Sequence, residues 1–184
     1  MRVTITTQPA ALLTHADAVV RQSLALSGTD RDAQVDALLL AAQAELDGPK
    51  GWVGISVAQQ SVEVVADAFD APLIRLPGGP IDIDSVAITY LDGAGNEQTL
   101  ASGYLVASDG TVTLASGASW PSIYDQAGAV TVAYDVGMTA GDPRISLMKT
   151  AIILHAKMTL DFDDVEVRRR AIEGLVRSMW VPML

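Results

Sequence analysis

The chain has 184 residues, with 12 lysines and arginines against 22 acidic residues and no cysteine. A net charge of −10 disfavours a basic face for nucleic acid, and the lack of cysteine excludes disulfides, thiolate catalysis and cysteine metal sites. Apolar residues make up 49% and charged residues 18%, which predicts a folded chain, one domain over residues 1–184, rather than disorder.

The amino-terminal part predicts a short arm and two helices. Residues 1–9 are β-prone and end at Pro9. Residues 12–26 carry apolar side chains at helical spacing, with Thr14 as the expected N-cap. A second helix is expected over residues 29–46, because its apolar positions repeat every three to four residues until Gly48-Pro49 ends it.

The middle of the chain, residues 52–137, has the texture of short strands separated by turns. Its centre is the stretch 76–91, in which a Pro77-Gly-Gly-Pro80 corner precedes alternating β-formers and polar residues. Asp84-Ser85 interrupts that alternation and predicts a bulge or a late start of the strand. Frequent turns, such as Asp92–Asn96, favour an antiparallel meander over βαβ units.

The carboxy-terminal part predicts two more helices and a tail. Asp142-Pro143 is a helix start, and the apolar face that follows is broad enough for a helix buried in the core or between subunits. A last helix runs from Val165 to about Met179, before the apolar tail 180–184. The predicted fold is α+β: helices over about 12–48 and 143–179 form a bundle with an inserted antiparallel β module over about 52–137.

Motifs for catalysis or for metal and cofactor binding are lacking. The only histidines, His15 and His155, lie in different predicted helices, and no nucleophile elbow or zinc-protease pair accompanies them. Turns and helix caps account for the carboxylate clusters more simply than calcium does. We therefore expect no enzyme activity, no metal and no cofactor, and no membrane segment, since no apolar run approaches the ~20 residues that span a bilayer.

Two groups of residues near the carboxy terminus remain candidates for contact with another molecule. In this acidic protein, Arg168–Arg170 are candidates for contact with DNA or an acidic partner, but a solvated helix face paired with Glu166 and Glu173 is the simpler interpretation. Trp180 lies in the apolar tail, which either folds back or docks on another protein.

The order of the segments resembles the head-tail connector (adaptor) proteins of tailed bacteriophages and gene transfer agents. The resemblance covers nearly the whole chain, and it departs from the family near residues 159–164 and at the tail. The matching pieces are Asp32-x-x-Val35-x-x-Leu38-x-x-Ala41-Ala42-x-x-Glu45, Gly51-Trp52, Leu76-Pro-x-x-Pro80, Val86-x-x-x-Tyr90-x-Asp92-x-x-Gly95, Tyr104-x-Val106, Gly117-x-x-Trp120-Pro121, Val130-Thr-Val-x-Tyr134-x-x-Gly137 and Pro143-x-Ile145-x-Leu147.

The resemblance implies a structural virion protein, assembled in the host cytoplasm, that forms a ring beneath the portal. The ring, twelvefold in the family, would join the DNA-filled head to a stopper or tail-completion protein and leave a channel for DNA without specific binding. The expected subunit-interface residues are Ile145, Met148, Ile152 and His155. The expected portal-docking residues are Arg168, Arg169, Trp180, Val181, Pro182, Met183 and Leu184.

Two alternatives come from other classes of protein. The β module could bind a carbohydrate or another ligand through Trp120 and Tyr124 on their loop. A hydrolase that uses His15 and His155 is the least supported, and it predicts that mutation of both histidines removes an activity.

Overall fold

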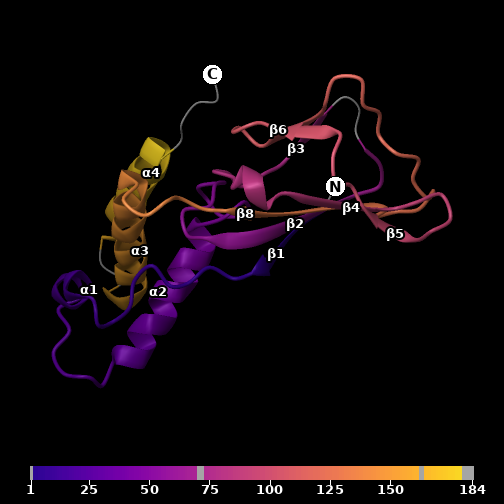
Figure 1. The fold of residues 1–184 in the computed structure, drawn as a ribbon. Helices are drawn as coiled ribbons and strands as arrows, with labels where there is room; N and C mark the ends of the chain where they lie inside the picture. The colour runs from indigo at the N-terminus through magenta and orange to yellow at the C-terminus, as the bar shows by residue number, and fades with distance from the viewer. Residues whose placement is uncertain (1, 70–72, 162–163, 180–184) are drawn as a thin grey trace. The chain divides into compact units, whose positions relative to one another are not determined.

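The computed structural model describes residues 2–69, 73–161 and 164–179, and it divides the chain into two compact units (Figure 1). The β unit comprises Met1–Pro9 and Gln59–Gly137, and the helical unit comprises Ala10–Ala58 and Met138–Leu184. The predicted β module thus corresponds to the β unit, which begins at residue 59 rather than 52 and also takes in the amino-terminal arm.

The larger sheet of the β unit has five antiparallel strands in the order β1-β2-β8-β4-β5. Val64 and Val132 pair between β2 and β8, and Val132 pairs again with Ile88 of β4, so apolar residues meet on one face. The antiparallel prediction is confirmed, but a simple meander is wrong, because β8 inserts between β2 and β4. The strands are β1 (Arg2–Thr7), β2 (Gln60–Ala66), β4 (Ala87–Leu91), β5 (Glu97–Thr99) and β8 (Val130–Val136).

A smaller antiparallel sheet, ordered β3-β7-β6, shares its core with the larger one. Ile74 and Val112 of this sheet are buried in one cluster with Val62, Ile88 and Val132 of the other. Its small strands are all three to four residues long: β3 (Leu73–Arg75), β6 (Tyr104–Val106) and β7 (Thr111–Leu114).

The interruption predicted in the central stretch is a short 3-10 helix, Ile83–Ser85, and β4 starts after it. The Asp82 carboxylate accepts the Asp84 N–H at its start. Nearby, the buried Tyr134 hydroxyl donates to the Pro77 carbonyl over 2.8 Å, and burial raises the pKa of that phenol. The proline corner is therefore held against β8, and the late-start prediction is confirmed.

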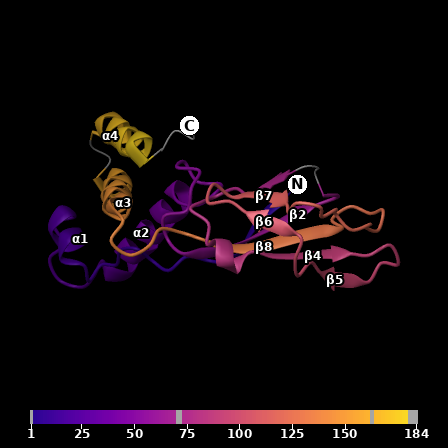
Figure 2. The same cartoon turned by 45° about the horizontal axis from the view of Figure 1, so that its top comes forward.

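The helical unit is built around α3, which packs against α2 on one side and α4 on the other (Figure 2). Its helices are α1 (Ala18–Ser23), α2 (Asp32–Leu46), α3 (Pro143–Asp161) and α4 (Val165–Met179). All four helices contribute to one apolar core that also contains Leu13, Val53, Val57 and Met138 from the connections. Within the described residues, no helix combines the length and the hydropathy required to cross a membrane.

Two predicted elements differ from the structure. The first predicted helix, residues 12–26, shrinks to α1, because the Asp17 carboxylate accepts the Thr14 N–H and hydroxyl and closes a turn there, so Thr14 is not an N-cap. Residues 52–58 form turns and extended segments rather than a strand, since the Val57 N–H bonds to the Asp47 carboxylate and not to a neighbouring strand.

Candidate interaction surfaces

The broad apolar face of α3 is used mainly inside the helical unit. Met148 and Ile152 are fully buried there, so their side chains present no surface to a second subunit. Ile145 is half-buried at the edge of the same core, and His155 is half-buried near the middle of the helix. Of the four predicted interface residues, Ile145 and His155 keep a surface that a neighbour can reach.

His155 links α3 to α2. Its Nε2 lies 3.0 Å from the Glu45 carboxylate on α2, and its ring meets the Trp52 ring edge to face, with centroids 6.1 Å apart. The Trp52 side chain is exposed. Its backbone is held at the end of α2, because its N–H donates a hydrogen bond to the Glu45 carbonyl. The three side chains form a small polar and aromatic seam at the surface where the two helices meet.

His15 belongs to a separate cluster at the other end of α2. Its backbone N–H and its Nδ1 lie 2.6 and 2.7 Å from the two Asp36 carboxylate oxygens, and these bonds lower the pKa of Asp36. The His15 Nε2 also lies 3.6 Å from Asp32, which pairs with Arg21. This cluster fastens the segment before α1 to the start of α2.

The structure does not bring the two histidines together into one site. Their α2 partners, Asp36 and Glu45, are nine residues apart, which is about 14 Å along a helix axis. Among residues 2–69, 73–161 and 164–179, no group of histidines and carboxylates is arranged to hold a metal ion. Each histidine instead pairs with its own carboxylate of α2, His15 with Asp36 and His155 with Glu45.

The arginines at the start of α4 have different roles. Arg168, with a side chain only 16% exposed, donates to the Lys157 carbonyl over 3.2 Å and approaches Asp161, so it joins α4 to the last turns of α3. Arg169 pairs with Glu173 and Arg170 with Glu166, at 3.5 and 3.4 Å on the exposed face. The solvated-face interpretation is confirmed for these two arginines; the predicted docking residues 180–184 lie outside the described residues.

Two aspartates hold the helical unit in shape: Asp47, which the sequence analysis left without a role, and Asp142, which it placed at the start of a helix. Asp47 is 6% exposed and accepts backbone N–H groups from Gly48, Val57 and Ala58, while burial raises the pKa of its carboxyl. Asp142 caps α3 by accepting the Arg144 N–H over 2.9 Å. The Arg144 guanidinium on the same carboxylate lowers the Asp142 pKa to about 2.

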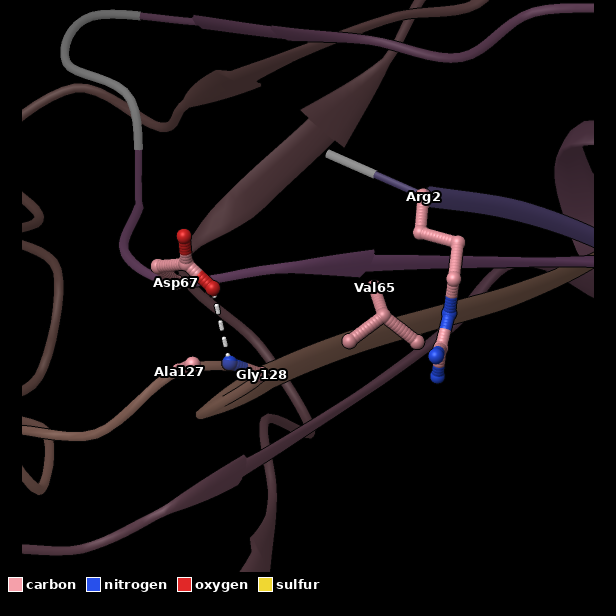
Figure 3. Close-up of a pocket in the computed structure, with 5 residues that line it drawn as sticks. All are labelled: Arg2, Val65, Asp67, Ala127 and Gly128. Atoms are coloured by element: carbon pink, nitrogen blue, oxygen red, sulfur yellow. Dashed lines mark hydrogen bonds between the residues drawn. The ribbon is translucent and has the colours of Figure 1, made fainter.

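Of the two aromatic residues predicted to bind a sugar, Trp120 packs on another ring of the β unit, whereas Tyr124 is exposed. Trp120 stacks face to face on Phe69, with ring centroids 4.6 Å apart and planes 1° from parallel, and Tyr124 is exposed without a stacked partner. A hollow of about 280 Å³ is lined by Arg2, Val65, Asp67, Ala127 and Gly128, with no aromatic ring, and Asp67 accepts the Gly128 N–H across it (Figure 3). The Trp120 ring face that stacks on Phe69 is therefore used in packing and is not open to a carbohydrate.

Comparison with known proteins finds matches among solved structures, but none among family models or curated sequences. No protein-family model matches the sequence, and no curated protein matches it. A chain from the neck of a native gene transfer agent particle, computed with C12 symmetry, matches with a TM-score of 0.73 at 20% identity. The match covers 100% of this chain and 97% of that one. The chain has the fold of a gene transfer agent neck protein.

Two further structures agree with this result. A chain from the neck of an empty gene transfer agent particle, computed with C6 symmetry, matches with a TM-score of 0.72 at 19% identity. A chain from the virion of a native gene transfer agent particle matches with a TM-score of 0.72 at 21% identity, and both matches cover 100% of this chain and 97% of the other. The resemblance to gene transfer agent connectors stated from the sequence is confirmed at the level of the fold.

Proposed function

We propose that the chain is a non-enzymatic head-tail connector of a phage-like or gene transfer agent particle. The observation that carries this proposal is the full-length match to chains from such particles and their necks. The protein acts as a ring subunit that lies between the portal and a stopper or tail-completion protein. Its place is the virion, after assembly in the host cytoplasm.

The charge of the chain fits a channel for DNA. Twelve copies at −10 each give about −120, and acidic walls repel DNA phosphates, so DNA passes without being held. Twelvefold symmetry is the family expectation, and the C12 symmetry of one similar neck supports it. In this ring Ile145 and His155 lie where a neighbouring subunit can contact the half-buried edge of α3.

Portal docking is assigned to the tail 180–184, whose five residues are apolar, together with Arg169 on α4. Because Met179 is fully buried in the helical core, a truncation that tests the tail must keep it. We expect a chain that ends at Met179 to keep its helical circular dichroism and its unfolding midpoint, and to lose capture by the portal protein of the same particle. Full-length Arg169→Ala is the control for the contribution of charge, and undiminished capture of the truncated chain would contradict the assignment.

A further inference from the structure

The outer face of α2 is exposed to solvent, but it carries only alanine and leucine side chains. Leu40 is 53% exposed, and the alanines that share its face are exposed as well. A helix that faces water usually carries charged residues there, whereas this face has none over three turns and lies opposite the buried face of Val35, Leu39, Ala42 and Leu46. The face consists of Ala33, Ala37, Leu40, Ala41 and Ala44.

α4 presents a second exposed face of small or apolar residues. Val167, at 67%, is the most exposed large apolar side chain in the described part of the chain. Ala171, Gly174 and Ser178 follow it at spacings of four, three and four residues, all exposed and all on one side of the helix. Side chains this small let a second helix approach closely, and Leu40 is the kind of residue that fills a groove between them.

The two helices have complementary charges. α2 carries Asp32, Asp36 and Glu45 and no lysine or arginine, a formal charge of −3. α4 carries four of the 12 basic residues of the chain against two glutamates, a formal charge of +2. Arg170 and Arg177 border the α4 face, and Arg177 has no ion pair within residues 2–69, 73–161 and 164–179. The charges favour contact of α2 with α4 over contact of α2 with another α2.

The placement of the two faces suits a ring. α3 separates α2 from α4, so the two faces belong to the two flanking helices of the unit (Figure 2). In a cyclic assembly above two copies, each subunit uses one patch toward one neighbour and a different patch toward the other. We propose that the α2 outer face of one copy packs against the α4 outer face of the next, an inference that rests on the proposed function.

Cysteine cross-linking tests this contact directly, because the chain has no cysteine of its own. Ala41→Cys and Gly174→Cys are combined in one chain, and a Cβ at Gly174 meets no atom within 4 Å, so the fold tolerates it. Purified protein at high concentration is treated with a short bismaleimide. We expect a ladder of dimers, trimers and larger species from the double variant, and only monomer and a faint dimer from either single variant.

The control pairs Ala41→Cys with Thr150→Cys, an exposed position on α3. An equal ladder from the control pair, strong dimers from Ala41→Cys alone, or no ladder from the double variant would overturn the inference. Electron microscopy of the unmodified chain with the portal separates the two proposals. Rings without a specific ladder remove the α2–α4 contact and leave the connector function, whereas neither rings nor a ladder removes both.

Discussion

Asp47 holds the end of α2 to the segment that leaves the helical unit, and its removal should destabilise that unit strongly. Its carboxylate accepts three backbone N–H groups at 2.8, 2.6 and 3.0 Å in a site that is nearly closed to water. Each bond to a charged acceptor contributes about 1.5–3 kcal/mol, and the cost of burying the carboxylate offsets part of the sum. For Asp47→Ala we expect a loss of about 3 kcal/mol in the free energy of unfolding.

Chemical denaturation followed by far-ultraviolet circular dichroism measures this loss, because helices occur mainly in the helical unit. Asp47→Asn keeps one acceptor oxygen and should lose about half as much. Asp82→Ala is the control, since this exposed aspartate accepts one bond at 3.2 Å and its loss should cost below about 1 kcal/mol. An Asp47→Ala variant as stable as Asp82→Ala would refute the reasoning that buried N–H groups depend on this carboxylate.

Two further predictions concern the start of α3 and the aromatic pair of the β unit. The Asp142 pKa, lowered from 3.8 to about 2, means that its pairing stabilises the fold fully above pH 3.8 and is lost as pH falls through 2. Asp142→Ala should cost about 1–2 kcal/mol at neutral pH and nothing at the acid limit, as denaturation at several pH values will show; a constant difference would contradict this. Trp120→Ala should cost about 3 kcal/mol through loss of its stack on Phe69, whereas Tyr124→Ala should cost under about 0.5 kcal/mol. Unchanged stability of Trp120→Ala, with loss of binding on a glycan array, would favour the carbohydrate alternative.

Local signals in the sequence predicted most of the elements. Asp142-Pro143 places the start of α3 correctly, because an N-cap followed by proline acts through the backbone of a single turn. The late start of β4 was likewise readable from Asp84-Ser85. The strand order could not be predicted from the sequence, because the position of β8 between β2 and β4 depends on pairing between residues far apart in the chain.

The roles of single side chains were harder to predict. Periodicity shows that Met148 and Ile152 lie on an apolar face, but it does not distinguish a core from a subunit interface, and the structure places both in the core. From the sequence, Asp47 is simply a residue at the end of a helix. Its partners Val57 and Ala58 are ten and eleven residues further along the chain, and only the fold brings their N–H groups to its carboxylate. The exposed face of α2 is visible only once its opposite face is known to be buried.

The central claim is that this chain assembles as a ring at the neck of a particle, and the most direct test is its mass. Light scattering of the chain with and without the portal protein, followed by electron microscopy of any large species, gives both the copy number and the symmetry. We expect a ring with a central channel, alone or on the portal, and twelve copies in the assembled form. A chain that stays monomeric and does not bind the portal at any concentration would contradict the account.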